Sequence, residues 1–415
     1  MKILLATSTI TPRAGISAYN RELCRVLSET NIMHLMCYEK IKEYADCEKT
    51  ISLPCFSLKY IRDVERLLRV INDECYDLII NSNSKIMALI SPYINRGTKI
   101  ITVSHSLRYT ESDIAAFNAS YVDGIVALSS YNKEYLEKKF AIKNNNKVRV
   151  IYNFVLPYES ADIIRTTKKN NQKINIVFAG GTASSKSPEL VIRVLNRLLK
   201  TDLDFKFFFL GVKTPPLKSI QPFKSIESII PSDQRVEMPG KVPTEEARKI
   251  FAECNVFLAP SRREGCPMAL LEALRVGTIP IVADYNIANR ELIENEISGY
   301  VINHKNIDEF VKRIIDIIMH HESYSSIYDN SYKLYQEKLT YEVWYAKMTK
   351  LIYDNDNWEY NHFRRQKFSR IHYCIDSFKF SLMNFFNKIH LFFNESLPAA
   401  LPILLMYLFK PKTNK

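Results

Sequence analysis

The segment Ser261-Arg-Arg-Glu-Gly-Cys-Pro-Met-Ala-Leu-Leu-Glu-Ala-Leu-Arg-Val-Gly-Thr-Ile-Pro-Ile-Val-Ala283 reads as a turn, a helix and a strand in succession. It follows the apolar run Val256-Phe-Leu-Ala-Pro260, which predicts a buried strand. Proline is favoured at the first position of a helix, and glycine is favoured just after its last residue. We therefore expect a helix that begins near Pro267 and ends at Gly277.

Two glutamates of this segment, Glu264 and Glu272, stand eight residues apart. The first lies on the expected loop and the second about a turn and a half inside the expected helix. Both carboxylates can then face the N-terminus of the helix, where unpaired amides and the helix dipole favour an anion. Amides that hold a phosphate, beside carboxylates that accept hydrogen bonds from hydroxyl groups, suit a nucleotide sugar.

The segment resembles the Glu-x7-Glu signature of the retaining glycosyltransferases of family 4, also described as glycosyl transferases group 1. The similarity includes Pro260-Ser261, the turn Glu264-Gly-Cys-Pro267, the helix Leu270-Leu-Glu-Ala273 and the strand start Gly277-Thr-Ile-Pro-Ile-Val-Ala283. This resemblance covers roughly residues 1–353. It implies the GT-B fold, in which two Rossmann-like domains face a cleft.

The order of apolar strands and amphipathic helices supports two such domains, because this alternation is typical of a doubly wound parallel sheet. In the first half, the expected strands are 2–7, 34–38, 78–81, 99–104, 124–128 and 148–151. In the second half, they are 174–179, 205–210, 236–238, 256–259, 279–282 and 300–302.

The domain boundaries follow from a polar run, Thr166-Thr-Lys-Lys-Asn-Asn-Gln-Lys173, which separates the two sets of strands. By resemblance to the family, the helix after the second set packs back on the first domain. The predicted organisation is an N-terminal acceptor domain over 1–157, a linker over 158–173, a nucleotide-sugar domain over 174–339, the final helix over 340–353 and a tail over 354–415.

The segment Phe178-Ala-Gly-Gly-Thr-Ala-Ser-Ser-Lys186 follows a predicted strand and precedes a predicted helix. Gly180 and Gly181 allow the backbone to approach a ligand closely. Lys186 can place its positive charge on a diphosphate. The helix that follows is expected to have Ser187 as its N-cap.

The family usually carries Gly-Arg-x-x-x-x-Lys at this place, and this chain departs from that pattern. The lysine is kept, whereas Gly181 or Thr182 stands where the arginine is usual. An arginine makes bidentate contacts that lysine cannot copy. The departure therefore either weakens donor binding or moves the role of the arginine to Arg262 or Arg263.

The resemblance assigns roles to the remaining donor-side residues. Glu264 contacts hydroxyl groups of the donor sugar, and Glu272 accepts hydrogen bonds from the ribose hydroxyls. Gly240 ends the strand beside the nucleobase. The amides around three residues of the turn meet the sugar or the distal phosphate: Gly265, Cys266 and Met268.

Two residues of the first domain complete the expected site. Gly15, in Arg13-Ala-Gly-Ile-Ser17, occupies the family's first glycine-rich loop, close to the diphosphate. His105 ends a predicted strand, where the family has a site histidine. A neutral imidazole can donate from one nitrogen and accept on the other, so His105 is expected to bind the donor sugar or to orient the acceptor.

The motifs contain no side chain that stands out as a covalent nucleophile. By resemblance, the acceptor attacks the front face of the donor sugar and the leaving diphosphate takes the acceptor proton. No cofactor is expected, and the motifs contain no Asp-x-Asp triplet, so no metal ion is expected either. The sequence leaves UDP and GDP open as the nucleotide of the donor.

The eight cysteines form no Cys-x-x-Cys pair, which is typical of reduced thiols in a cytoplasmic protein. The chain carries a net charge of +12. Nine of its Lys and Arg residues, against one Asp and one Glu, fall in residues 360–415, which gives this tail a net charge of +7 (9 − 2). No apolar run is long enough to predict a transmembrane helix.

The tail also carries an apolar seam at intervals of three and four residues. Its members are Phe368, Ile371, Ile375, Phe378, Leu382, Phe385, Ile389 and Phe392. A basic amphipathic helix of this kind can lie on an anionic membrane surface, here through residues 360–410, on the inner face of the cell membrane. The alternative is that it packs on the first domain or on another subunit.

These features predict a retaining hexosyltransferase that transfers a sugar to a glycan or lipid-linked acceptor. Bacterial surface polysaccharide, such as lipopolysaccharide or capsule, is the expected product. One alternative is a nucleotide-sugar epimerase of the same fold. Another is a non-catalytic membrane-bound partner protein with a degenerate donor site. The charge indicates no nucleic-acid partner, because no recognition motif accompanies it.

Overall fold

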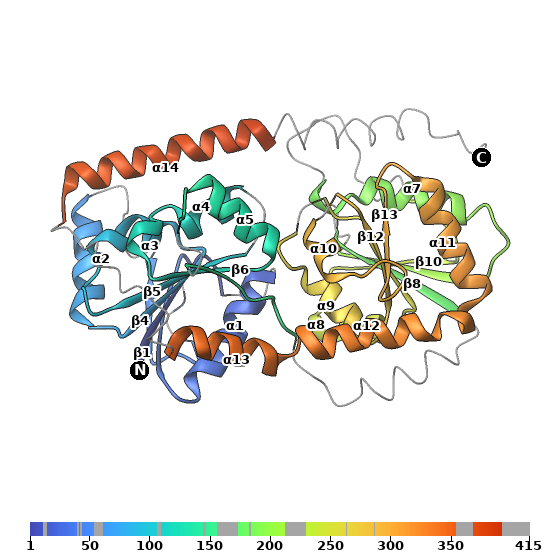
Figure 1. The fold of residues 1–415 in the computed structure, drawn as a ribbon, viewed down its shortest axis with the longest axis horizontal. Coiled ribbons are helices and arrows are strands. Elements are labelled where there is room, and N and C mark those ends of the chain that lie inside the picture. The colour runs from blue at the N-terminus through green and yellow to red at the C-terminus, as the bar shows by residue number, and fades with distance from the viewer. Residues whose placement is uncertain are drawn as a thin grey trace. The chain divides into compact units, whose positions relative to one another are not determined.

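The computed structural model describes residues 1–10, 15–39, 41, 44–53, 61–105, 109–143, 147–155, 173–181, 184–211, 230–262, 264–285, 287–353 and 368–391. The chain divides into two compact units (Figure 1). Unit 1 comprises residues 1–153 and 345–387, and unit 2 comprises residues 154–344 and 388–415. Almost all of the predicted linker, Arg263, and tail residues 354–367 and 392–415 lie outside the described residues.

Unit 1 is built on a seven-stranded parallel sheet with the strand order β3-β2-β1-β4-β5-β6-β7. Its strands are β1 (Lys2–Thr7), β2 (Ile32–Cys37), β3 (Lys49–Ser52), β4 (Leu78–Ser82), β5 (Lys99–Ser104), β6 (Gly124–Ala127) and β7 (Val148–Val150). Its first helices are α1 (Gly15–Ser28), α2 (Ile61–Asp73), α3 (Lys85–Ile90), α4 (Tyr109–Ala116) and α5 (Ser130–Lys139), with short 3-10 turns η2 (Ser91–Tyr93) and η3 (Ala119–Tyr121).

Strand β3 is the element of this sheet that the sequence analysis missed. It has only four residues, Lys-Thr-Ile-Ser, and only Ile51 among them is buried. A strand at the edge of a sheet is covered less than a central one, so it needs no apolar run. The other six strands lie where the sequence predicts them.

Unit 2 contains a six-stranded parallel sheet with the order β10-β9-β8-β11-β12-β13. Its strands are β8 (Ile174–Ala179), β9 (Phe205–Leu210), β10 (Val236–Gly240), β11 (Val256–Ala259), β12 (Ile279–Ala283) and β13 (Tyr300–Ile302). Its helices are α7 (Pro188–Leu198), α8 (Thr244–Glu253), α9 (Met268–Arg275), α10 (Ile287–Leu292), α11 (Ile307–Met319) and α12 (Ser325–Lys338), with 3-10 turns η4 (Ser184–Lys186) and η6 (His321–Tyr324).

The core of unit 2 shows why these strands are almost entirely apolar. Helices cover both faces of a parallel sheet, so the side chains of its inner strands are buried, whereas the edge strand β10 is partly exposed. In β9, Phe205, Phe207 and Phe209 pack in one cluster with residues of α7 and α11, including Leu195 and Phe310. The doubly wound α/β class predicted from the sequence is therefore confirmed in both units.

Two helices of the C-terminal region, α13 (Tyr341–Tyr353) and α14 (Arg370–Leu391), complete the described fold. Near the end of α13, the Ile352 carbonyl accepts a hydrogen bond of 3.0 Å from Lys99 Nζ of β5. Residues 345–387 thus belong to unit 1, and α14 lies along α2, α3 and α4 (Figure 1). Among the described helices, none combines the length and the hydropathy that crossing a membrane requires.

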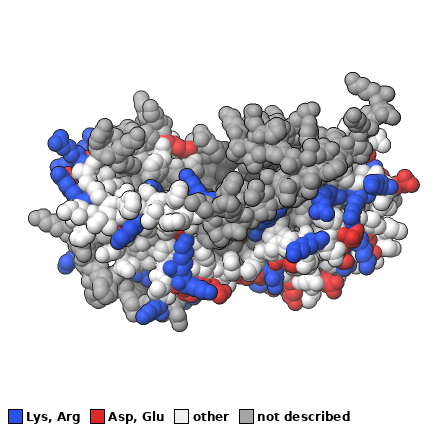
Figure 2. All heavy atoms as spheres, turned by 90° about the horizontal axis from the view of Figure 1, so that it is seen from above, with Lys and Arg blue, Asp and Glu red and all other residues white. Residues whose placement is uncertain are grey.

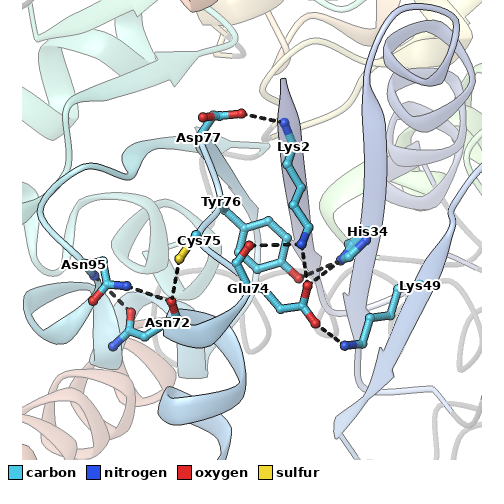
Figure 3. Close-up of polar contacts among 9 residues, drawn as sticks. All are labelled: Lys2, His34, Lys49, Asn72, Glu74, Cys75, Tyr76, Asp77 and Asn95. Carbon is cyan, nitrogen blue, oxygen red and sulfur yellow. Dashed lines mark hydrogen bonds and ion pairs between the residues drawn. The ribbon is translucent and has the colours of Figure 1, made fainter.

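A cluster of charged side chains ties the amino ends of three strands of unit 1 together (Figure 3). Lys2 of β1 donates from Nζ to Glu74 Oε2 at 2.5 Å and to the Glu74 carbonyl at 3.0 Å. Lys49 of β3 forms an ion pair with the other Glu74 oxygen. His34 Nδ1 of β2 lies 2.9 Å from the Tyr76 hydroxyl. Hydrogen bonds from Lys2 and then from Lys49 lower the pKa of Glu74 to about 2.

Glu74 is expected to make the stability of unit 1 depend on pH in the acid range. An unfolded glutamate titrates near pH ~4.3, so between that value and its folded pKa of about 2 the unfolded chain binds more protons. The stabilisation by Glu74 is therefore complete above pH ~4.5 and is lost as the pH falls. The difference between the thermal midpoints of the wild type and Glu74→Gln should shrink from pH 6 to pH 3.5.

Glu22→Gln is the control for this comparison, because Glu22 pairs at 3.1 Å with Arg25 on the surface of α1. Its midpoint should stay close to that of the wild type at both pH values. If the thermal midpoints of the wild type and Glu74→Gln differed by the same amount at pH 6 and pH 3.5, the low pKa assigned to Glu74 would be wrong.

Candidate functional site

The turn between β11 and α9 forms as the sequence predicts, with one shift at its end. Pro267 is the N-cap of α9 and not its first residue. Gly277 follows the helix with a φ of +65°. Its amide donates to the Leu274 carbonyl at 3.0 Å, and the Thr278 amide donates to the Ala273 carbonyl at 2.9 Å. This Schellman motif requires a positive φ, and glycine adopts it without strain.

Lys186 and Glu264 meet at the carboxyl edge of the unit 2 sheet. They come from the segments that follow the neighbouring strands β8 and β11, and their side chains form an ion pair. The Arg262 amide donates to the Ser185 carbonyl at 2.7 Å, which ties the same two segments together. Ligands of open α/β sheets bind at this edge. Two predicted site residues far apart in sequence are thus brought into contact.

Glu272 is held by two arginines. Its Oε1 accepts a hydrogen bond of 3.2 Å from Arg248 Nε of α8, and its Oε2 lies 3.5 Å from Arg275 Nη2. Arg275 is fully buried, one turn further along α9. The buried guanidinium needs a carboxylate beside it, because an isolated charge in the interior is costly. The Glu272 carboxylate therefore has a structural partner as well as the predicted role toward ribose.

Arg262 occupies a different environment from the one its predicted role suggests. Its Nη2 donates to Glu189 Oε1 at 2.6 Å, and its Nε donates to Ser187 Oγ at 3.2 Å. Burial raises the pKa of the Glu189 carboxyl, and the Arg262 guanidinium opposes that shift. The contacts hold Arg262 in place but direct its charge toward a glutamate.

The predicted side-chain cap by Ser187 is wrong. Ser187 does precede α7, but it has a left-handed backbone and its side chain caps no amide of the helix. Its hydroxyl instead lies 2.7 Å from the Tyr285 hydroxyl and contacts Arg262. The Tyr285 hydroxyl in turn donates to the Pro260 carbonyl at 2.8 Å. The Ser187 side chain therefore contacts a network that includes the segment after β11, in place of the amides of α7.

Three glycines lie at the carboxyl ends of β8, β9 and β10. Gly181, Gly211 and Gly240 all have positive φ values, of 61°, 84° and 80°. The Gly211 amide donates to the Gly240 carbonyl at 2.8 Å, and the Gly181 amide donates to the Leu210 carbonyl at 3.2 Å. A Cβ atom on Gly181 would lie 2.8 Å from the Gly211 carbonyl oxygen. This contact explains why no larger residue occupies position 181.

The other predicted donor-side residues lie in the same two segments. Gly180 packs so tightly that a Cβ atom there would lie 2.5 Å from the Phe178 ring and 2.9 Å from Lys186 Cβ. Gly265 and the buried Cys266 form the turn before α9, and Met268 is the first residue of that helix. The segments after β8 and β11 therefore contain all of the predicted donor-binding residues of unit 2 except Gly240, which ends β10, and Glu272, inside α9.

In unit 1, Gly15 is the first residue of α1, and His105 follows β5 in a buried polar network. His105 Nε2 lies 2.6 Å from Ser82 Oγ at the end of β4. Ser82 Oγ in turn lies 2.5 Å from Asn20 Oδ1 of α1. The Asn20 amide nitrogen donates to Thr7 Oγ1 at 2.6 Å and to the Thr9 carbonyl at 3.3 Å.

This network determines which nitrogen of His105 carries the proton. The Thr9 carbonyl only accepts, so the Asn20 nitrogen faces it and Asn20 Oδ1 faces Ser82. Ser82 has a single hydroxyl proton, which it donates to Asn20 Oδ1; the proton between Ser82 and His105 therefore belongs to Nε2. Burial lowers the pKa of His105 to about 3, so the ring is neutral at pH 7 and Nδ1 is an acceptor.

Sequence reasoning named the candidate site residues but missed the side chains that contact them. Asn20 and Ser82, which orient His105, carry no motif; a polar Asn81-Ser82 pair that ends a buried strand was the available signal. Arg275 could have been found as a charged residue within an apolar helix and strand pattern. Glu189 and Tyr285, which fix Arg262, gave no local signal.

Two Asp-x-Asp triplets exist outside the motifs. Asp202-Leu203-Asp204 precedes β9 and lies at the amino edge of its strand, where Asp204 pairs with Lys173 at 2.6 Å. Asp354-Asn355-Asp356 falls outside the described residues. Within the described ranges, no three or more His, Cys, Asp or Glu side chains form a group that could hold a metal ion.

Comparison with known proteins relates this geometry to a family. Residues 159–334 match the family model described as Glycosyl transferases group 1. An uncharacterized glycosyltransferase of Haemophilus influenzae is 26% identical over 307 residues, which cover 71% of this chain and 80% of that protein. The poly(ribitol-phosphate) α-N-acetylglucosaminyltransferase of Staphylococcus aureus is 24% identical over 205 residues, 48% of this chain and 38% of that protein.

Among solved structures, HepE of Anabaena in complex with UDP-glucose superimposes with a TM-score of 0.67 and 14% identity. The match covers 85% of this chain and all of that one. At this identity the likeness establishes the fold only. The GT-B architecture of two Rossmann-like units, predicted from the sequence, is therefore confirmed.

Proposed function

We propose that this chain, whose residues 159–334 match the Glycosyl transferases group 1 model, is a retaining, metal-independent hexosyltransferase. Its donor is a UDP- or GDP-linked sugar, and its acceptor is a glycan or a lipid-linked glycan of a bacterial surface polysaccharide such as lipopolysaccharide or capsule. We place it in the cytoplasm, because its eight cysteines follow no disulfide framework.

The observation that carries the proposal is the contact between Lys186 and Glu264 at the carboxyl edge of the unit 2 sheet. An ammonium group has three donors, so Lys186 can keep one on Glu264 and direct another to a diphosphate. The turn that contains Gly265 and Cys266 leads into the N-terminus of α9, which favours the same anion. Positive charge, amides and a carboxylate thus lie together.

In the proposed reaction, the bond between the anomeric carbon of the sugar and the diphosphate oxygen breaks. The acceptor oxygen forms its bond from the same face, and its proton moves to the leaving diphosphate. Lys186 stabilises the charge that develops on the diphosphate, and Glu264 positions the sugar through its hydroxyl groups. Glu272 accepts hydrogen bonds from the ribose.

We assign His105 an accepting role within this reaction. Because Nε2 donates to Ser82, the neutral ring offers Nδ1 as an acceptor for a hydroxyl group of the donor sugar or of the acceptor. Gly15, at the start of α1, is proposed to lie near the diphosphate. We propose that no metal ion or cofactor takes part, since Lys186 and the α9 N-terminus supply positive charge.

The proposal is tested by thermal denaturation with UDP, GDP and their sugars. A ligand at 100 times its Kd stabilises the folded chain by about 2.7 kcal/mol. One nucleotide class should raise the midpoint in the wild type, and the additional stabilisation by its sugar conjugate should be lost in Glu264→Gln. Turnover with an acceptor should survive EDTA, and the new linkage should keep the anomeric configuration of the donor.

Three outcomes would contradict this proposal or one part of it. Conversion of a nucleotide sugar in the absence of any acceptor would identify an epimerase. Loss of turnover in EDTA, restored by Mg²⁺, would refute metal independence. The absence of any response to the nucleotides would favour a non-catalytic partner protein, for which the glycine at position 181 is the supporting observation.

A further inference from the structure

Helix α14 has two apolar faces, and only one of them is packed against unit 1. Tyr373 and Phe380 are buried in the unit 1 core cluster, together with the half-buried Met383. The Phe380 ring lies 4.9 Å from the Phe117 ring, centroid to centroid. Phe368, just before the helix, lies 5.0 Å from the Tyr93 ring.

Polar contacts hold both ends of α14 on unit 1 as well. Arg370 at its first turn binds both carboxylate oxygens of Glu65 in α2, at 2.7 and 2.9 Å. Asn387 near its other end donates to Asp113 Oδ2 of α4 at 2.6 Å. The helix is therefore docked along its length, and its orientation about its own axis is determined.

The opposite face of α14 carries the apolar seam that the sequence predicts. Ile371, Ile375, Phe378, Leu382 and Phe385 follow one another at intervals of four, three, four and three residues, and Phe386 lies beside them. All six are exposed; Ile371 is 73%, Phe378 68% and Phe385 57% accessible. Six large exposed apolar side chains on one helix face form a patch that calls for an occupant.

Basic residues border this outward face. At 3.6 residues per turn, Lys379 lies at one edge of the seam and Lys388 at the other, where Arg370 also lies but is paired with Glu65. The one acidic residue of the helix, Asp376, is on the packed side and 3.6 Å from Lys379. Seen from above, this part of unit 1 shows white side chains among blue Lys and Arg (Figure 2).

We propose that the outward face of α14 is a membrane-binding surface that inserts its apolar seam into an anionic lipid interface. The positive charge at both edges meets the lipid headgroups, and the aromatic side chains enter the boundary of the acyl chains. The contacts with unit 1 hold the helix parallel to the surface of that unit, so the seam is presented before binding.

A second copy of the chain is the competing occupant, and the charge argues against it. Two α14 helices packed seam to seam would bring lysines and arginines of the same sign together at both edges. The tail as a whole carries nine Lys and Arg residues against two acidic ones. An anionic surface neutralises this charge, whereas a second copy doubles it. The inference goes beyond the proposed transfer reaction and does not depend on it.

The experiment is sedimentation of the full chain with vesicles of phosphatidylcholine alone or with phosphatidylglycerol added, without any nucleotide. The wild type should bind the anionic vesicles much more tightly. Phe378→Asp combined with Phe385→Asp should weaken binding on the order of 100-fold. Lys379→Glu should weaken it about tenfold or more, on anionic vesicles only.

Matched controls exist in unit 2. Met319, at the end of α11, is 59% exposed, and Met319→Asp replaces an exposed apolar side chain by one aspartate outside the seam. Lys333 on α12 has a side-chain exposure of 69% against 65% for Lys379, and each lysine lies within 4 Å of an acidic residue of its own helix. The control variants Met319→Asp and Lys333→Glu should bind like the wild type. All variants should keep the wild-type melting midpoint.

Unchanged vesicle binding by the double aspartate variant would overturn the proposal. So would binding that is equal with and without phosphatidylglycerol. A dimer in sedimentation equilibrium that the double variant dissociates would assign the face to a second copy. Because no donor or acceptor is present, a failed transfer reaction leaves these outcomes unaffected.

Discussion

Lys186→Met is expected to lower kcat/KM for sugar transfer by about 100- to 1000-fold, the usual loss when one group that stabilises developing charge is removed. Lys186 ends the η4 turn and contacts Glu264, so its ammonium lies at the carboxyl edge of β8 and β11. Methionine fills similar space without a charge. The loss should lower kcat and not only raise KM, because the diphosphate gains charge as its bond to the sugar breaks.

Lys206→Met is the matched control for this loss. Lys206 is also a lysine of unit 2 paired with a glutamate, with Nζ 2.6 Å from Glu237 Oε1, but it lies on the surface of β9. Its replacement should leave transfer unchanged. If both variants retained the wild-type kcat/KM, Lys186 would have no part in the reaction, and the proposed donor site would have to be abandoned.

Glu272→Ala is expected to destabilise unit 2, because it removes one partner of a buried ion pair, a loss that can reach about 3–5 kcal/mol. The substitution removes the carboxylate that lies 3.5 Å from the fully buried Arg275. It also removes the acceptor of the hydrogen bond from Arg248 Nε. Chemical denaturation of unit 2, followed by hydrogen exchange of its strands, measures the loss.

Glu245→Ala provides the comparison, because Glu245 also contacts Arg248, at 2.9 Å, but its side chain is largely exposed. A surface ion pair of this kind contributes at most about 1 kcal/mol. Equal stability losses in the two variants would show that Arg275 does not need Glu272. Because of this structural role, nucleotide binding by Glu272→Ala should be measured only on protein that is shown to be folded. A loss of binding can then be attributed to the missing contact with the ribose.

The sequence predicts most of the fold because the signals are local. In β9, five of the six residues of the run Phe-Lys-Phe-Phe-Phe-Leu are apolar, so the run predicts a buried strand without reference to the rest of the fold. The end of α9 at Gly277 depends only on nearby backbone amides and carbonyls. Strand β3 is not predicted, because an edge strand needs only one buried side chain and so carries no apolar run. The packing of α14 on unit 1 is one of the alternatives that the sequence leaves open, and the structure shows it. The sequence cannot decide, because the seam with the strongest period is the exposed face and the packed face has the weaker pattern.

The candidate site is predicted in part for the same reason. Glu264 and Lys186 are each marked by a motif, but their contact spans 78 residues and depends on the adjacency of β8 and β11. The partners of Arg262 and His105 are set by packing between elements, which no spacing encodes. Glu189 and Ser82 therefore become visible only when the strands are placed side by side.

Two of the three left-handed glycines restrict each other's replacement. Gly181 and Gly211 exclude each other's side chains, since a Cβ on the first meets the carbonyl oxygen of the second at 2.8 Å and a Cβ on the second meets the amide of the first at 3.1 Å. A single replacement of Gly181 by arginine is therefore expected to strain this backbone. The two positions are expected to be epistatic, because neither accepts a side chain unless the other shifts.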